Sequence, residues 1–148
     1  MGWIETEGSV LIDKYVPPLP CKAGEAKHYP YRDRRLYWVN GVGIVYRADR
    51  VNVVGATVSN VSQGGEFVPA TAPFPGELAA RESAIAMLEQ AGVYYAGIDF
   101  LNGVLTELTF DCLGGIADLE RDHPGFAAFF TKAVLSSIPA PGDTLFNE

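Results

Sequence analysis

Two carboxylates in an apolar hairpin are the residues of this chain best suited to chemistry. The stretch 91–115, AGVYYAGIDFLNGVLTELTFDCLGG, predicts two apolar strands joined at Asn102-Gly103, with Asp99 and Glu107 near the middle of each. Such strands are expected to be largely buried, and a buried carboxylate is costly unless its charge is compensated. A divalent cation held between the two carboxylates would compensate it. The alternative is that both carboxylates lie on the solvent face of an amphipathic hairpin.

The register of this hairpin decides whether the two carboxylates can share an ion. A two-residue loop at Asn102-Gly103 pairs Asp99 with Thr106 and turns Glu107 to the opposite face, because a slip of one residue reverses every side chain. A three-residue loop that adds Val104 pairs Asp99 directly with Glu107. The alternation of polar and apolar residues along the second strand favours the three-residue loop.

The elements that must position these carboxylates are strands in hairpins and two or three helices. We expect a strand over 9–16, a hairpin over 35–47 that turns at Asn40-Gly41, a helix over 77–90 capped by Gly92, the hairpin over 93–110, and helices over 115–122 and 126–138. The segments 21–33 and 67–76 contain Gly and Pro and are expected as loops. Because hairpins replace alternating β-α-β units, the pattern predicts an α+β fold with an antiparallel sheet and helices packed on one face.

Length and composition indicate an ordinary globular protein. The chain has 148 residues, of which 48% are hydrophobic and 20% charged, and this suits one domain with a substantial core. We expect that domain over 1–138 and a flexible tail over 139–148. The net charge of −7 argues against nucleic acid as a partner. We interpret the basic cluster Arg32-Asp33-Arg34-Arg35 as a solvated turn or strand edge.

The sequence carries neither a recognisable signal peptide nor a stretch near the roughly 20 apolar residues of a membrane helix. Its two cysteines, Cys21 and Cys112, are expected to be reduced thiols. His28 and His123 have no partner in the sequence and are expected to be structural. We therefore expect a cytoplasmic protein that does not bind a membrane.

The segment GIDFLNGVLTEL resembles the C-terminal signature of ATP-grasp ligases, and most of all those of the bacterial glutathione synthetase type. That signature is approximately G-[IL]-D-[IV]-[IL]-G-x-x-[LY]-T-E-[IL]-N, and the matching residues are Gly97, Ile98, Asp99, Leu101, Leu105, Thr106, Glu107 and Leu108. The resemblance extends over 9–138. It includes the hairpin RRLYWVNGVGIVYRADR, which leads to Arg50, and a glycine loop with Asn60, Gly64 and Gly65.

The resemblance implies an ATP and Mg²⁺ site. Asp99 and Glu107 would ligate Mg²⁺ ions that bridge the phosphates of ATP, while Arg50 would hold negative charge. The glycine loop, with Asn60, Gly64 and Gly65, would close over the reacting acyl phosphate. The implied reaction phosphorylates a small-molecule carboxylate, and an amine then displaces phosphate to form an amide. Positioning and electrostatics dominate the catalysis of such phosphoryl transfers.

Two of the departures from the family pattern bear directly on the site. Thr109 stands where the family has an Asn as the third metal ligand, and a hydroxyl is a poorer Mg²⁺ ligand than an amide oxygen. Asp111, two residues further on the same strand face, could take over this role as a metal ligand. Glu66 stands where the family has an Arg just after the glycine pair, which reverses the charge at a place where an anionic substrate is expected.

The resemblance also implies that a complete enzyme of this type is much longer than the chain. We therefore expect an incomplete Mg-ATP half-site, inactive alone and completed by a partner chain or by the rest of a longer gene product. The apolar surface that such a half-cleft exposes predicts a homodimer. The alternative is a non-catalytic ligand-binding or interaction domain that keeps the ATP-grasp fold. Thr109 and Glu66 favour this alternative, whereas Asp99 and Glu107 favour the ligase.

Overall fold

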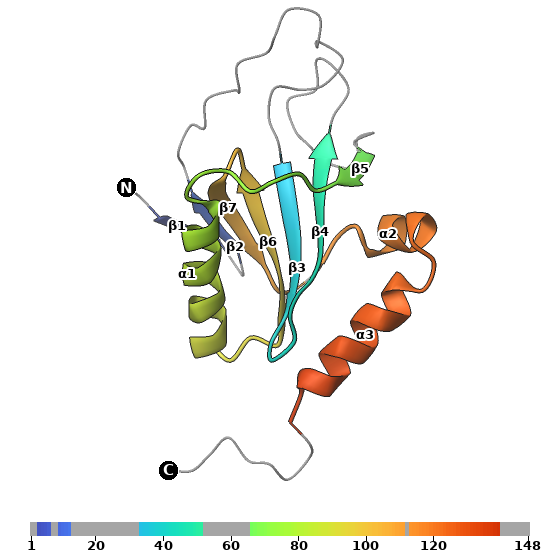
Figure 1. The fold of residues 1–148 in the computed structure, drawn as a ribbon. Coiled ribbons are helices and arrows are strands. Elements are labelled where there is room, and N and C mark those ends of the chain that lie inside the picture. Colours follow the sequence, from blue (N-terminus) through green and yellow to red (C-terminus); the bar gives the residue numbers. More distant parts are fainter. Residues whose placement is uncertain (1–2, 7–8, 13–32, 52–65, 112, 140–148) are drawn as a thin grey trace, which may run out of the picture.

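A computed structural model of the chain describes residues 3–6, 9–12, 33–51, 66–111 and 113–139. Its strands are β1 (Trp3–Thr6), β2 (Ser9–Ile12), β3 (Asp33–Val39), β4 (Gly43–Val51), β5 (Glu66–Pro69), β6 (Tyr95–Leu101) and β7 (Val104–Thr109). The last five form an antiparallel sheet in the order β5-β4-β3-β6-β7 (Figure 1). β1 and β2 pair with each other in an antiparallel two-stranded sheet.

Three helices complete the described part of the chain, namely α1 (Glu77–Gln90), α2 (Ile116–Asp122) and α3 (Phe126–Ser137). The predicted helix over 77–90 is confirmed, and Gly92 after it has a positive φ of 68°, as expected at a helix C-terminus. The antiparallel sheet and these helices confirm the predicted α+β class.

Among the helices described, none is both long and apolar enough to cross a membrane.

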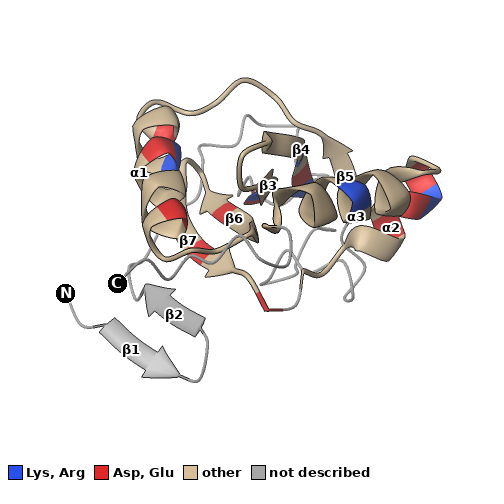
Figure 2. Ribbon diagram, turned by 90° about the horizontal axis from the view of Figure 1, so that it is seen from below, with Lys and Arg blue, Asp and Glu red and all other residues tan. Residues whose placement is uncertain are grey.

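The helices cover both faces of the sheet, whereas the sequence predicted that they would pack on one. α1 packs with Leu36, Trp38 and the apolar residues of β6 on one face. α2 and α3 pack with Tyr37 and Val39 on the other, and Figure 2 shows the helices on the two sides of the sheet. The reason lies in β3, where every residue from 34 to 39 is buried. Because successive strand residues point to opposite faces, a strand that is buried throughout needs cover on both.

One strand lies in a segment that the sequence predicted as a loop. β5 pairs with the outer side of β4 and forms an edge of the sheet. Its last residue is Pro69, which lacks a backbone donor, and proline is tolerated at sheet edges for that reason. The prolines of 67–76 therefore did not prevent a strand there.

The β6–β7 hairpin confirms the pairing of Asp99 with Glu107 but not the loop from which we derived it. Leu101 pairs with Val104, so the loop has two residues, Asn102 and Gly103. Their φ angles are 50° and 84°, the positive pair that a type I′ turn requires. A bulge at Thr106 then shifts the register by one residue and brings Glu107 opposite Asp99.

Arg34 attaches α1 to the sheet through a buried ion-pair cluster. Its Nε lies 2.7 Å from Asp49 Oδ1 on β4, and its Nη1 lies 2.7 Å from Glu77 Oε1 at the start of α1. The other oxygen of Glu77 accepts the backbone N–H of Phe74 at 2.9 Å. Arg34 is 2% exposed, so the interpretation of the basic cluster as solvated is wrong for this residue. Its carboxylate partners lie 15 and 43 positions further along the chain, so no short segment of the sequence reveals them.

We predict that Arg34→Met destabilises the protein strongly, because it removes the guanidinium that pairs with the buried carboxylates of Asp49 and Glu77. Removing one partner of a buried ion pair costs about 3–5 kcal/mol. Urea unfolding followed by the fluorescence of the buried Trp38 measures the loss. Arg47→Met, at an exposed position of β4, is the matched control and is expected to change stability by less than about 0.5 kcal/mol. Equal effects of the two substitutions would contradict the prediction.

A second prediction concerns the hairpin loop. A Cβ added at Gly103 would lie 2.5 Å from Phe74 Cβ, whereas one added at Gly41, at the tip of the β3–β4 hairpin, would meet nothing within 4 Å. Both glycines have positive φ, so an alanine at either position is destabilised by the same kind of backbone strain. We expect Gly103→Ala to lose a further 1–3 kcal/mol or so from overpacking, measured as the difference between the two unfolding free energies. A difference near zero would show that Phe74 does not restrict the loop.

Candidate functional site

One row of charged residues crosses three neighbouring strands. Arg35 on β3 lies opposite Asp99 on β6, and Asp99 lies opposite Glu107 on β7. Directly paired residues on neighbouring strands point to the same face and lie about 5 Å apart. The sheet thus brings together the two carboxylates selected from the sequence and adds an arginine beside them.

Arg35 and Arg50 hold the carboxylate of Asp99. Arg35 donates from Nε to Oδ1 at 2.7 Å and from Nη2 to Oδ2 at 2.5 Å, which is a bidentate pair. Arg50 donates from Nη2 to Oδ2 at 3.0 Å. Asp99 is 2% exposed. Compensation of its buried charge was expected from the sequence, and here the compensating groups are two guanidiniums.

A second carboxylate completes this group. Arg50 also donates from Nη2 to Asp33 Oδ1 at 2.5 Å. We call Asp33, Arg35, Arg50 and Asp99 the Asp99 cluster. It contains two cations and two anions, so the charges balance if all four are ionised.

Burial and ion pairing shift the pKa values of the cluster residues in opposite directions. Burial raises the pKa of Asp33 from 3.8 to about 6, although the charge and hydrogen bond of Arg50 lower it. Burial lowers the pKa of Arg35, but the hydrogen bonds and the charge of Asp99 together outweigh this and raise the pKa overall. Burial likewise lowers the pKa of Arg50, and the charges of Asp99 and Asp33 raise it more. Both arginines therefore remain cations at any ordinary pH.

Residues outside the Asp99 cluster also contact the Arg35 side chain. Arg35 Nη1 donates to the carbonyl of Gly114 at 3.3 Å, and the Tyr37 hydroxyl donates to the same carbonyl at 3.0 Å. Burial raises the pKa of Tyr37 to about 12, so the hydroxyl keeps its proton. A Cβ at Gly97 would lie 2.8 Å from Leu113 Cδ2 and 3.5 Å from Arg35 Nε. Glycine at this signature position therefore leaves room chiefly for the Leu113 side chain, which packs beside Arg35.

The remaining residues selected from the sequence have different environments. The side chains of Glu107 and Asp111 are exposed. The Oγ1 atom of Thr109 is buried and has no hydrogen-bond partner among the described residues. Asn60, Gly64 and Gly65 lie outside the described residues, as does the side chain of Glu66.

Asp99 and Glu107 supply the oxygen ligands that Mg²⁺ prefers, but their present arrangement does not fit a resident ion. Both oxygens of Asp99 accept guanidinium N–H groups. A cation at Asp99 would also approach two positive charges, which repel it. Within the described part of the chain, no three His, Cys, Asp or Glu side chains are grouped as a metal site. Asp99 can become a ligand only if the arginines release it.

Sequence reasoning missed Asp33 and Arg35 as members of the site. Both lie in the basic cluster that we interpreted as a solvated turn or edge, and that interpretation is wrong for Arg35, which is 7% exposed. The available signal was the position of Arg35 in an apolar strand. What the sequence did not reveal is that β3 pairs with β6, the contact that places Arg35 against Asp99.

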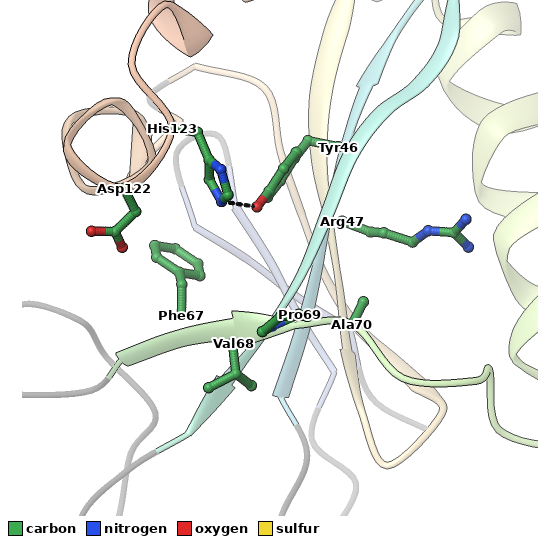
Figure 3. A pocket seen from close by; sticks show the side chains of 8 residues that line it. All are labelled: Tyr46, Arg47, Phe67, Val68, Pro69, Ala70, Asp122 and His123. Carbon is green, nitrogen blue, oxygen red and sulfur yellow. Dashed lines mark hydrogen bonds between the residues drawn. The ribbon is translucent and has the colours of Figure 1, made fainter.

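A pocket of about 540 Å³ lies away from the Asp99 cluster, between α2 and the β4–β5 edge (Figure 3). The Tyr46 hydroxyl and His123 Nε2 are 2.6 Å apart and form a hydrogen bond at its wall. Burial raises the pKa of Tyr46. The contact gives His123 a packing partner, in keeping with the structural role expected for it. The other lining residues are Arg47, Phe67, Val68, Pro69, Ala70 and Asp122.

The raised pKa of Asp33 predicts a pH-dependent stability. Between pH 4 and 6 the folded protein keeps a proton on Asp33 that the unfolded chain has released, so stability falls as pH rises through this window and is level above it. A rise from 3.8 to about 6 corresponds to about 3 kcal/mol. Urea unfolding of the native chain and Asp33→Asn at several pH values should give a difference that falls by about that amount. The exposed-site variant Glu82→Gln should leave the native profile unchanged, and a difference that rises with pH would refute the assignment.

Comparison with known proteins agrees with the site's sequence signature. The profile of the family described as prokaryotic glutathione synthetase, ATP-grasp domain, matches residues 23–124. A curated glutathione synthetase from Prochlorococcus marinus (strain MIT 9313) is 32% identical over 96 residues, which cover 60% of this chain and 28% of that relative. The chain thus spans only a part of the relative's length. Since the family profile matches well over half of the chain, the chain belongs to the ATP-grasp domain family of prokaryotic glutathione synthetases.

Proposed function

We propose that the chain contributes part of the nucleotide-phosphate site of an ATP-dependent carboxylate–amine ligase. The observation that carries this proposal is the row of Arg35, Asp99 and Glu107 across the sheet, within a chain of the glutathione synthetase ATP-grasp family. Guanidinium groups recognise phosphate and carboxylate oxygens through paired N–H donors. The carboxylates supply oxygens of the kind that bind Mg²⁺.

In this proposal each group has a distinct role. Arg35 and Arg50 hold anionic oxygens of the nucleotide or of the activated carboxylate, and their raised pKa values keep them charged. Glu107 is exposed beside Asp99 and provides the accessible carboxylate for Mg²⁺. Asn60, Gly64 and Gly65 are proposed for the loop that closes over the substrate. ATP, Mg²⁺ and a small-molecule carboxylate are the proposed ligands.

We further propose that a second copy, a partner chain or a further segment completes the cleft, and that the chain is inactive without it. Phe129 and Leu135 on α3 are 52% and 65% exposed, and exposed apolar side chains of this size support association. A cytoplasmic location is part of the same proposal.

A second candidate function is a non-catalytic ligand-binding or interaction domain. Two observations favour it. Asp99 is engaged by two arginines, and Thr109 offers a hydroxyl in place of the family's amide ligand. A protein that kept the fold without the reaction would tolerate both features.

Calorimetric titration of a non-hydrolysable ATP analogue, with and without Mg²⁺, separates the two functions. We expect Mg²⁺-dependent binding that weakens at least tenfold in Glu107→Gln, because an accessible carboxylate is lost; tenfold equals about 1.4 kcal/mol. Asp99→Asn/Glu107→Gln should abolish the Mg²⁺ dependence.

The matched control for this titration is Glu89→Gln, which removes the same charge from an exposed position of α1. It is expected to bind as the native chain does. If the native chain binds no nucleotide at millimolar concentration, the ligase assignment is wrong and the non-catalytic function is favoured.

A further inference from the structure

We propose that the pocket between α2 and the β4–β5 edge binds a small quaternary ammonium ligand, held by aromatic side chains and one carboxylate. The volume of this pocket is about 540 Å³, and small-molecule sites measure roughly 300–1,000 Å³. None of its lining residues belongs to the Asp99 cluster. The inference therefore goes beyond the proposed nucleotide site and does not depend on it.

Three aromatic side chains form one wall of the pocket. Tyr46 comes from β4, Phe67 from β5, and His123 from the C-terminal cap of α2, so the sheet and the helix both contribute. The ring centroids of Tyr46 and His123 lie 5.3 Å apart at an interplanar angle of 58°, and Figure 3 shows Phe67 beside them. Because the face of an aromatic ring attracts a cation within about 6 Å of its centroid, this wall suits a positively charged ligand.

The polar atoms of the same wall are engaged with each other. The Tyr46 hydroxyl and His123 Nε2 are 2.6 Å apart and form a hydrogen bond. A primary ammonium or guanidinium group that enters the pocket gives up hydrogen bonds to water, which these engaged atoms replace only in part. A quaternary ammonium group has no N–H to satisfy and needs only the ring faces and an opposite charge. The wall therefore favours the quaternary cation.

Asp122 supplies the opposite charge. The other charged lining residue, Arg47, extends away from the pocket in Figure 3, because it follows Tyr46 in β4 and successive strand residues point to opposite faces. The Asp122 carboxylate lies 3.3 Å from Arg121 Nε, and both side chains are exposed. Since exposed ion pairs are weak, a ligand can compete with Arg121 for this carboxylate. The net charge of −7 also favours a cation over an anion.

The test is a titration of the full chain with choline at constant ionic strength, followed by heteronuclear NMR of the backbone amides. Two probes separate shape from charge: the neutral alcohol with carbon in place of the choline nitrogen, and ethanolamine, a cation without the methyl groups. We expect choline to shift the signals of residues 67–70 and 122–123 and to bind about fivefold or more tighter than either probe. Signals that do not move at these residues, or a probe that binds as tightly as choline, overturn the proposal.

Variants of the carboxylate assign the charge. Asp122→Asn should weaken choline binding about threefold and leave the affinity for the neutral alcohol unchanged. Glu89→Gln, which removes an equal charge from an exposed position of α1, is the matched control and should change neither affinity. Arg121→Gln should tighten choline binding, because it removes the cation that competes for Asp122. Equal effects of Asp122→Asn and Glu89→Gln, or a loss of affinity in Arg121→Gln, contradict the assignment and overturn the proposal.

Phe67→Leu tests the aromatic wall. Leucine keeps an apolar side chain at this position but removes the ring face, so choline should bind about two- to fivefold more weakly while the neutral alcohol binds as before. An equal loss for both ligands would show that the wall acts by packing alone, which overturns the cation site. If Phe67→Leu does not fold, the comparison of choline with the neutral alcohol on the native chain tests the same contact. The nucleotide titration tests a different site, so either result can fail without the other.

Discussion

Two adjacent arginines in the central strand impose the constraint on which the rest of the structure depends. Arg34 and Arg35 are both buried in β3, and successive residues of a strand point to opposite faces. Each guanidinium therefore needs its own carboxylate partner on its own side of the sheet, because a buried cation without one is strongly destabilising. Asp49 and Glu77 pair with Arg34 on the α1 side, and Asp99 pairs with Arg35 on the other.

The two faces differ in what surrounds the ion pairs. On the face of Arg34, α1 begins at Glu77 and its first residue joins the cluster, so the interaction fastens a helix to the sheet. On the face of Arg35, the next residue in the row is Glu107, which is exposed. Both ion pairs are thus buried, but the pair on the α1 side is joined to a helix, whereas the pair on the other side lies next to an exposed carboxylate. This asymmetry is why we assign structure to Arg34 and ligand binding to Arg35.

The hairpin shows how a correct pairing can arise from a different local structure. Asn102-Gly103 forms the two-residue turn that its sequence favours, and by itself that turn would place Glu107 on the wrong face. The bulge at Thr106 corrects the register by one residue, and the Thr106 hydroxyl donates to the Asp99 carbonyl at 3.1 Å. The polar and apolar alternation along β7 indicated which side chains share a face, but it did not indicate where the extra residue would be accommodated.

The sequence by itself determined the helices, the β3–β4 and β6–β7 hairpins and the α+β class, because these depend on periodicity, turn residues and caps within short segments. It indicated the pairing of Asp99 with Glu107 through the alternation along β7 alone. Only the tertiary structure decided which strands became neighbours across the sheet and which helices covered each face. The pairing of β3 with β6 joins residues 64 positions apart and sets Arg35 against Asp99. Such contacts depend on the summed burial of both faces, which no short segment encodes. For that reason the sequence predicted a carboxylate in need of a counter-charge, and the fold determined that the counter-charge is arginine.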